Sequence, residues 1–400
     1  MKNPIDLAAE AAAFADQYQM LPQGSTVLCA VSGGKDSMAL LSVLQTLAPE
    51  RNLMIHAAHF NHQLRGEESQ RDEDFVSKWC ADHNIPLTIG SGDVAQAAQE
   101  QGKGIEETAR AMRYGFLTET AQEVGAEKIA TAHNADDNAE TVLLHLVRGS
   151  GLDGLTGIPP VRGILIRPLL GVPRIDIEVY LAQENIPHVE DSSNQDTKFA
   201  RNRIRQAILP VMKDLNPAFV STLSANLVHL REDRELLHDM AESVTCEALV
   251  EDGKVSIQAA SLADLPHPIA ARAVKQLLAK AGRFQVSAVH IDQIIELATG
   301  ETPSANLNLP EGLRGGATLR LHTVRRFSHT TLGRAHLLSG HRIAEGSMSG
   351  ADVNVWRNIR PAEGGKAVRL PVSLSPGQEV LLSGILPEGE NRARTLVLEG

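Results

Sequence analysis

The chain up to about residue 210 alternates short apolar runs with longer stretches of helical character. The predicted strands lie at 26–31, 53–59, 86–89, 128–132 and 164–166, and the predicted helices at 37–47, 69–83, 105–124 and 135–147. Connections as long as these helices return the chain to the edge from which it started, so neighbouring strands must run parallel. The sequence therefore predicts an α/β fold with a five-stranded parallel sheet covered on both faces, whose ligands bind at the carboxyl ends of the strands.

The region after residue 217 follows a different pattern. Apolar residues recur there at steps of three, four or seven, which places them on one face of a long helix; they are Leu223, Leu227, Leu230, Leu237 and Val244. We interpret 217–249 as a connecting helix and 1–216 as the domain that precedes it. Two further domains are predicted, a small mixed α/β domain at 250–328 and a β-rich C-terminal domain at 329–400.

Short periodic runs support these two later domains. The mixed domain contains predicted helices at 269–281 and 286–297, and the C-terminal domain is rich in Gly and Pro with β-like runs at 367–372, 379–382 and 395–398.

Charge is unevenly distributed along the chain. The net charge of −11 argues by itself against a nucleic-acid partner. From Arg314 onward, however, 12 Lys and Arg face 7 Asp and Glu, a local excess of +5 that leaves −16 on the remainder. A basic tail of this kind can bind phosphates, and chance clustering of charge explains it almost equally well.

The composition indicates the cellular compartment in which we expect the protein. No apolar stretch approaches the ~20 residues that span a membrane, and the first residues lack the features of a signal peptide. The three cysteines, Cys29, Cys80 and Cys246, are odd in number and far apart, which suits a reducing environment. We expect a cytoplasmic protein without a membrane partner, and both a monomer and a homodimer stay open.

The strongest local signal lies between the first predicted strand and the first predicted helix, in Ser32-Gly33-Gly34-Lys35-Asp36-Ser37. Glycines let the backbone approach a ligand closely, and the N–H groups of such a loop converge on an anion at the helix start. The serine hydroxyls and the Lys35 ammonium add donors. A carboxylate among phosphates is repelled unless a cation lies between them, so Asp36 is interpreted as a Mg²⁺ ligand. The alternative is a tight turn that needs glycine for geometry alone; the full hexapeptide favours phosphate binding.

A second group of polar residues follows the fourth predicted strand. His133, Asp137 and Glu140 are spaced four and three apart, so we expect them on one helix face at the same sheet edge as the glycine loop. Two carboxylates can hold an ammonium group or a metal, and histidine can contact phosphate or carry a proton. Asp136 is interpreted as a helix-dipole partner without a role in chemistry.

Three segments with basic or mixed polar residues can be interpreted either as parts of a functional site or as ordinary local structure. The polar run 59–66 follows the second strand and suits either base recognition or turn chemistry. Glu106 and Arg110 could form a helix pair, with Arg113 one turn further and within reach of a triphosphate. The cluster 201–205, which contains Arg205, suits phosphate oxygens or a solvated helix face.

Taken together, these residues resemble the tRNA(Ile)-lysidine synthetase family of PP-loop ATP pyrophosphatases. The loop Ser-Gly-Gly-x-Asp-Ser carries the superfamily resemblance, and further blocks carry the family resemblance. These blocks are His59-x-Asn61-His62-x-Leu64-Arg65, Ala109-Arg110-x-x-Arg113-Tyr114, Ala132-His133, Leu152-Asp153-Gly154-Leu155, Arg167-Pro168-Leu169-Leu170, Asp191-Ser192-Ser193-Asn194 and Arg201-Asn202-x-Ile204-Arg205. The family has Gln at the position of Asn138 and often Asn at that of Gly104, and its Trp-Asp-Gly-Arg segment has its nearest counterpart in Trp356-Arg357-Asn358.

The resemblance implies a Rossmann-like PP-loop ATPase fold and a reaction with ATP, Mg²⁺, L-lysine and tRNA(Ile) carrying a CAU anticodon. It implies that the C2 oxygen of the wobble cytidine attacks the α-phosphate of ATP, and that lysine then displaces AMP to give lysidine. It also implies roles for particular residues: 32–37 bind ATP, Asp36 holds the metal, Asp137 and Glu140 bind lysine, and Asp137, Arg113, His133 and Arg205 take part in catalysis. The domains at 250–328 and 329–400 would contact the tRNA.

Two other functions compete with this interpretation. A tRNA thiolase on the same ATP domain needs a cysteine pair or an iron–sulfur site, and the sequence contains no Cys-x-x-Cys. A non-catalytic nucleotide- or RNA-binding module would have no need for Asp36 and Asp137.

Overall fold

The computed structural model of the chain describes residues 5–64, 66–190, 200–251, 254–282 and 287–299, and after them the backbone of short strands between 306 and 399. The chain divides into two compact units, Met1–Arg234 and Glu235–Gly400. The predicted boundaries at 217, 250 and 329 stay predictions.

The first unit is built on the predicted parallel sheet. Its strands lie in the order β3-β2-β1-β4-β6-β5, with bounds β1 Thr26–Ala30, β2 Met54–Asn61, β3 Leu87–Ser91, β4 Lys128–Ala130, β5 Val161–Arg162 and β6 Leu165–Ile166. All five predicted strands are present and pair in parallel. The sheet also has a sixth strand, β5, which runs antiparallel to β6 because a two-residue turn with Gly163 at φ +60° joins them.

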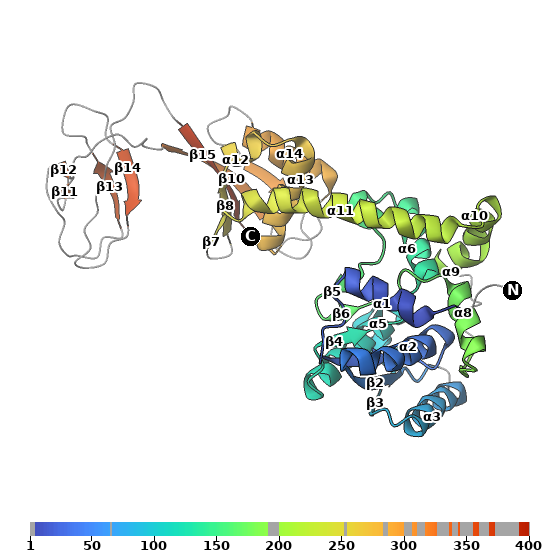
Figure 1. Cartoon of the computed structure of the whole chain (residues 1–400). Coiled ribbons are helices and arrows are strands. Elements are labelled where there is room, and N and C mark those ends of the chain that lie inside the picture. The colour runs from blue at the N-terminus through green and yellow to red at the C-terminus, as the bar shows by residue number, and fades with distance from the viewer. Residues whose placement is uncertain are drawn as a thin grey trace. The chain divides into compact units, whose positions relative to one another are not determined.

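Helices cover both faces of this sheet (Figure 1). The four predicted helical segments are helices in the structure, α2 Lys35–Arg51, α3 Glu67–Asp82, α5 Ile105–Glu123 and α6 Ala135–Val147. The structure adds the helices α1 Leu7–Gln17, α4 Val94–Gln101, α7 Leu152–Leu155, α8 Arg174–Gln183, α9 Ala200–Arg203, the π-helix η2 Ile204–Ile208 and α10 Leu209–Leu215.

The burial pattern along β1 shows how the two faces are packed. Val27 and Cys29 lie in the larger core, which α1, α2 and α8 cover. Leu28, between them in sequence, lies in a smaller core with Leu117 of α5 and Ile129 of β4. Successive residues of a strand point to opposite faces, and each fully buried Leu or Ile contributes roughly 1.5–3 kcal/mol. The two cores therefore fix the sheet between the helix layers.

The long helix predicted after residue 217 is α11, Phe219–Thr245. Phe219 and Leu223 pack in the first unit, whereas Leu237, Ala241 and Val244 pack in the core of the second. The apolar face of α11 thus packs in two cores, one with its N-terminal part and the other with its C-terminal part.

The second unit contains an antiparallel five-stranded sheet in the order β7-β8-β15-β10-β9. The strand bounds are β7 Leu249–Glu251, β8 Lys254–Gln258, β9 Asn306–Leu309, β10 Ala317–Arg325 and β15 Arg392–Glu399. The helices are α12 Ala260–Ala263, α13 His267–Lys280 and α14 Ala288–Thr299, and β11 His336–Leu337 pairs with β12 Ile343–Ala344 and β13 Val355–Ile359 with β14 Val368–Val372.

The strand β15 lies between β8 and β10, so the end of the chain shares a sheet with the region predicted as the mixed domain. The β-like runs predicted at 367–372 and 395–398 coincide with β14 and β15, and the run at 379–382 lies outside the described residues.

Candidate active site

The glycine loop lies where the direction of the sheet connections changes. β1 pairs with β2 on one side and with β4 on the other, so the loops that follow β1 and β4 leave the sheet side by side. This is the position at which open α/β sheets bind ligands. It also brings Asp36, at the start of α2, near Asp137, at the start of α6.

Contacts with Val189 and within the loop fix the backbone of the glycine loop. Gly33 has φ +88°, and a Cβ there would lie 2.9 Å from a Val189 side-chain carbon, so glycine is required. The Val189 N–H donates to the Gly33 carbonyl at 2.9 Å. In the loop itself, Ser37 donates its hydroxyl to the Gly34 carbonyl at 2.9 Å and accepts the Ser32 N–H at 3.2 Å. These contacts fix the predicted loop before any ligand binds.

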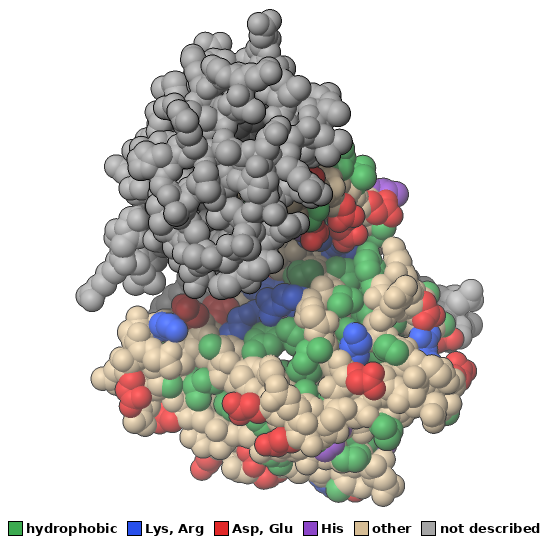
Figure 2. Space-filling model, turned by 90° about the vertical axis from the view of Figure 1, so that its left-hand side faces the viewer, with side chains coloured by type: hydrophobic (Ala, Val, Ile, Leu, Met, Phe, Trp, Pro, Cys, Tyr) green, Lys and Arg blue, Asp and Glu red, His purple; other side chains and the backbone are tan. Residues whose placement is uncertain are grey.

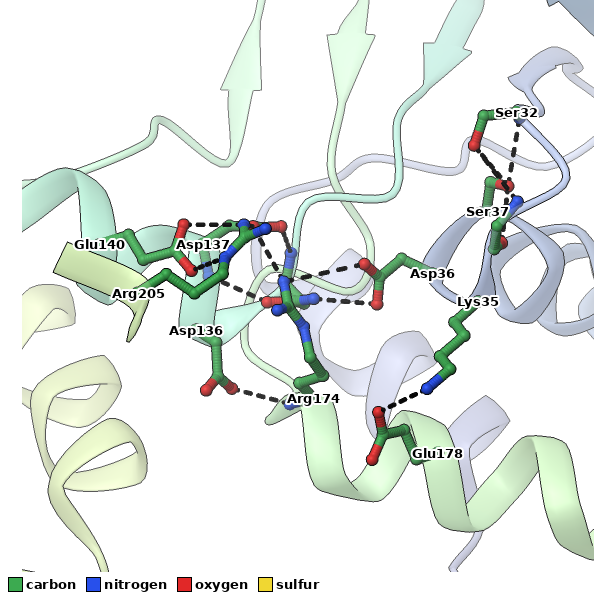
Figure 3. Close-up of polar contacts among 12 residues, drawn as sticks. Ser32, Lys35, Asp36, Ser37, Asp136, Asp137, Glu140, Arg174, Glu178 and Arg205 are labelled. Carbon is green, nitrogen blue, oxygen red and sulfur yellow. Dashed lines mark hydrogen bonds and ion pairs between the residues drawn. The ribbon is translucent and has the colours of Figure 1, made fainter. Parts of the chain in front are cut away.

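Lys35 points away from the loop that it was predicted to serve. Its ammonium group contacts the Glu178 carboxylate of α8 at 3.1 Å, as Figure 3 shows. Both side chains are about 40% exposed, so this pair contributes at most about 1 kcal/mol and can open at little cost. The predicted phosphate contact of Lys35 would require that opening.

Asp137 and Glu140 lie on one face of α6, as their spacing predicts, and both are paired with arginines. Glu140 is fully buried, and its carboxylate accepts from Arg205 Nε at 2.6 Å, Arg205 Nη2 at 2.9 Å and Arg201 Nε at 3.0 Å. Asp137 Oδ1 lies 3.2 Å from Arg205 Nη2 and 3.4 Å from Arg201 Nη2. The predicted basic cluster at 201–205 is thus brought against the predicted carboxylates.

Asp137 has two further partners. Its second oxygen accepts the backbone N–H of Asn134, whose side chain in turn accepts the Asp137 N–H, so the two residues form the capping box of α6. Its first oxygen also contacts Arg174 Nη2 at 3.2 Å. Arg174 was not singled out from the sequence, because a lone arginine at a helix start carries no local signal.

Asp36 joins the glycine loop to this group. Its Oδ1 accepts from the Asn134 side-chain amide at 3.0 Å, and its Oδ2 lies 4.0 Å from Arg174 (Figure 3). The pKa of Asp36 is raised to about 6, chiefly by burial. The positive charge of Arg174 opposes this increase, and the negative charge of Asp137 adds to it. We call Asp36, Asp137, Glu140, Arg174, Arg201 and Arg205 the paired centre.

His133 does not share the helix face of Asp137 and Glu140, which corrects the prediction. Asn134 caps α6, so the helix begins after His133. The imidazole contacts the Thr131 hydroxyl at 3.1 Å. Burial, together with the smaller effect of four nearby arginines, lowers the pKa of His133 to about 3, so the ring is neutral at physiological pH.

Asp136 has the structural role that the sequence suggests, through partners that the sequence did not indicate. Its buried carboxylate accepts the backbone N–H of Arg174 at 2.8 Å and pairs with Lys213 of α10 at 2.5 Å. It therefore ties the starts of α6 and α8 to α10.

The polar run after β2 is engaged in local structure. His59 is buried and contacts the Val31 carbonyl at 2.9 Å, and Asn61 donates to Glu73 at 2.8 Å and accepts the Gln63 N–H at 3.0 Å. These bonds favour turn chemistry over base recognition for His59 and Asn61. Arg65 lies outside the described residues.

Asp36 fits a magnesium ion that is shared with phosphates. In the described part of the chain, no three His, Cys, Asp or Glu side chains gather as they would around a metal held by protein alone. Mg²⁺ in phosphate-handling sites typically takes one or two carboxylates and completes its shell with phosphate and water. The Asp36 carboxylate, 29% exposed, has the accessibility that such a ligand needs.

Comparison with known proteins agrees with this geometry. Residues 7–212, about half of the chain, match the family model of the PP-loop domain, and residues 258–330 match that of the TilS substrate binding domain. Within 5–64, 66–190 and the other described ranges, no helix is long and apolar enough to cross a membrane.

Curated relatives extend the match. The tRNA(Ile)-lysidine synthase of Geobacter sulfurreducens is 36% identical over 316 residues, 77% of this chain and 67% of that protein. The synthase of Geobacillus kaustophilus is 34% identical over 310 residues, 76% of this chain and 67% of the relative. That of Thermotoga maritima is 48% identical over 198 residues, so this chain spans about half the length (48%) of that relative. The chain belongs to the tRNA(Ile)-lysidine synthase family.

Proposed function

We propose that this protein is an AMP-forming ligase that adenylates the C2 position of the wobble cytidine in the CAU anticodon of tRNA(Ile), releases pyrophosphate and then joins L-lysine to give lysidine. The observation that carries the proposal is the bond between Asn134 and Asp36. It joins a preformed glycine loop to a centre of carboxylates and guanidinium groups, in a chain whose relatives carry the names of lysidine synthases.

The glycine loop would bind the triphosphate of ATP. Backbone N–H groups between Gly33 and Ser37 converge at the start of α2, where the helix dipole favours negative charge. The hydrogen bonds of Ser32 and Ser37 fix the loop, so little conformational entropy remains to be lost when phosphate binds.

Asp36 would hold Mg²⁺ on the side of the loop that faces the paired centre. Bound there, the ion supplies positive charge that offsets repulsion among the phosphate oxygens and this carboxylate. Because Asn134 donates to Asp36 and accepts from Asp137, both carboxylates keep a fixed orientation.

Positive charge from the chain would assist the adenylation step. In that step the C2 oxygen of cytidine forms a bond to the α-phosphorus while the bond to pyrophosphate breaks. Arg174 and Arg205 lie where they can donate to oxygens that gain charge, and Arg113 is half-buried on α5 nearby in the fold. His133, neutral in its surroundings, would serve as a hydrogen-bond donor to phosphate.

The lysine step would use the carboxylates of α6. The ε-amine attacks C2, the bond from C2 to the AMP oxygen breaks, and the amine loses a proton. Asp137 is the more accessible carboxylate, with a side chain 12% exposed against 0% for Glu140. We therefore propose that Asp137 contacts the lysine ammonium group directly and accepts its proton. Glu140 would contribute to lysine binding indirectly, because it holds Arg201 and Arg205 in place.

Pyrophosphate release is the decisive measurement. Purified protein with ATP is expected to release pyrophosphate only when tRNA(Ile) with a CAU anticodon is present, and lysine is expected to convert the adenylated tRNA to the lysidine product with release of AMP. Release that is independent of tRNA, or incorporation of another amine in preference to lysine, contradicts the proposal.

A thiolase activity on the same fold finds no support in the cysteines. Cys29 and Cys80 are buried, and burial raises the pKa of each thiol, to about 11 for Cys80. A thiol is a poor nucleophile until it ionises. Transfer of sulfur to tRNA by the purified protein would reverse this judgement.

A further inference from the structure

A group of cations outside the paired centre has no carboxylate partner among the residues that the structure describes. The guanidinium carbons of Arg110, Arg113 and Arg162 lie 5.0, 5.4 and 5.9 Å from the ring centroid of Tyr114. Arg167 follows β6, is 98% buried and donates through Nη1 to the Pro159 carbonyl at 2.6 Å. We call these four arginines and Tyr114 the arginine–tyrosine cluster.

The charge of this cluster is not balanced by the protein. None of its arginines forms an ion pair with a carboxylate in the ranges that the structure describes, and the predicted helix pair of Glu106 with Arg110 is not formed there. Cation–π contact with one ring stabilises these cations only modestly. Burial raises the pKa of the Tyr114 hydroxyl, but Arg110, Arg113 and Arg167 together hold it below its ordinary value.

Arg167 gives a second, independent sign of a missing ligand. Its Nε is buried and has no hydrogen-bond acceptor among the residues that the structure describes. A buried donor without an acceptor destabilises the folded chain, and more so when the group is charged. Buried guanidinium groups are normally paired or bound to an anion, so this cost is most simply offset by an acceptor from outside the protein.

The cluster lies beside the paired centre. Arg110, Arg113 and Arg167 are close enough to His133 to lower its pKa, and His133 precedes Asn134, which holds Asp36. Figure 2 shows Lys and Arg side chains gathered near the middle of one face, with Asp and Glu side chains both beside them and scattered over the lower part of the view. An anion bound by the cluster would therefore lie next to the reaction site and outside the glycine loop.

We propose that the arginine–tyrosine cluster is a second phosphate-binding site, with Arg113 and Arg167 as its floor and the exposed Arg110 and Arg162 as its rim. Guanidinium groups suit phosphate because their donors match its oxygens in pairs. Three of them cover the Tyr114 ring, so the ring orients cations and is not free to stack on a base. The inference rests on the proposed function, in which two sources can supply the phosphate, the RNA backbone and the triphosphate of ATP.

The test removes charge from the rim, where the fold tolerates it. Arg110→Gln, Arg162→Gln and the double variant are compared with Arg71→Gln, which removes the same charge from an exposed arginine paired with Asp72 on α3. Affinity is measured separately for ATP with Mg²⁺ and for a tRNA(Ile) transcript with a CAU anticodon, the latter at several salt concentrations. Circular dichroism and melting temperature check that each variant is folded, and Arg162→Lys, which keeps the charge, should restore part of the affinity.

Three outcomes have defined meanings. An approximately tenfold loss of tRNA affinity, with a salt slope less steep by about one per arginine and unchanged ATP affinity, supports the site and identifies the RNA backbone. A comparable loss of ATP affinity with unchanged tRNA binding supports the site and identifies the triphosphate. If the double variant matches Arg71→Gln for both ligands, the proposed site is overturned.

The proposed function can fail separately from this inference. Binding is measured without lysine and without turnover. Should the wild-type protein bind both ligands and form no lysidine, the ligase assignment fails while the rim variants still decide whether the cluster binds phosphate. Pyrophosphate alone serves as an additional probe, because it carries the same oxygens without a base or a sugar.

Discussion

The paired centre and the arginine–tyrosine cluster use the same cation in opposite ways. In the paired centre, Arg201 and Arg205 are neutralised by Asp137 and by a fully buried Glu140. In the cluster, three guanidinium groups lie over one tyrosine ring and Arg167 is buried near them, and none of the four has a carboxylate partner among the described residues. A buried charge needs a partner. The first group contains its own counter-charge, whereas we propose that the second takes it from a bound phosphate. The first arrangement holds structure and orientation, and the second is suited to binding.

The largest effect is expected when the paired centre is made to resemble the cluster. Glu140→Gln removes the fully buried one of the two carboxylates that pair with Arg201 and Arg205, and should lower the free energy of unfolding by about 3–5 kcal/mol. Denaturant unfolding measures this loss. The control is Glu178→Gln, which breaks the exposed pair with Lys35 and should cost no more than about 1 kcal/mol. Equal losses for the two variants would mean that burial of the paired centre contributes nothing to the free energy of unfolding.

Asp36 lies at the border of the paired centre and should affect chemistry more than stability. Asp36→Ala should reduce pyrophosphate release by about 10²–10³-fold, because it removes the accessible carboxylate beside the glycine loop. The fold should survive, since the residue forms one side-chain hydrogen bond to Asn134 and a distant contact to Arg174. Release at the wild-type rate would show that Asp36 binds no metal.

Asp137→Asn should separate the two substrates. Loss of the negative charge weakens attraction for an ammonium group, so the apparent affinity for lysine should fall by about tenfold while that for ATP changes little. Steady-state kinetics with each substrate varied in turn gives both values. If the affinity for lysine is unchanged and that for ATP falls, Asp137 serves the metal or the phosphates instead.

The effect that is smallest at neutral pH is that of His133, because it appears only as the pH falls. The pKa of His133 is lowered to about 3 in the folded chain from an ordinary value near 6.5, so the unfolded chain binds more protons between these values. His133 therefore contributes stability that is present above pH 6.5 and is lost as pH falls toward 3, by at most about 1.4 kcal/mol per pH unit. His133→Gln should remove this part of the pH dependence in unfolding measurements.

The same histidine can report on the cluster. Phosphate bound by Arg110, Arg113 and Arg167 would offset the charges that disfavour imidazolium, so the pKa of His133 should rise when ligand binds. An NMR titration of the ring with and without pyrophosphate tests this. A pKa that ligand does not move would place the phosphate away from the cluster.

The sequence was a reliable guide to the first unit for a physical reason. Buried parallel strands are continuous apolar runs, and the helices between them are long enough to show their period, so the predicted strands and four helices are confirmed. The fifth segment is the second strand of a hairpin that the pattern did not reveal, because β5 and β6 contain two residues each. The position of β15 between β8 and β10 was equally hidden, since pairing over such a separation leaves no local trace.

By itself, then, the sequence determined the parallel sheet, the glycine loop at its edge, the shared helix face of Asp137 and Glu140 and the family resemblance. Each of these depends on residues close together in the chain. Tertiary structure decided which charges meet. Arg201 and Arg205 pair with carboxylates of α6 that lie more than 60 positions away in sequence. Lys35 contacts Glu178, and Arg162 lies over the ring of Tyr114 on α5. Ion pairs are short-ranged and have no sequence period, so only the folded chain shows which cations are satisfied and which are left for a ligand.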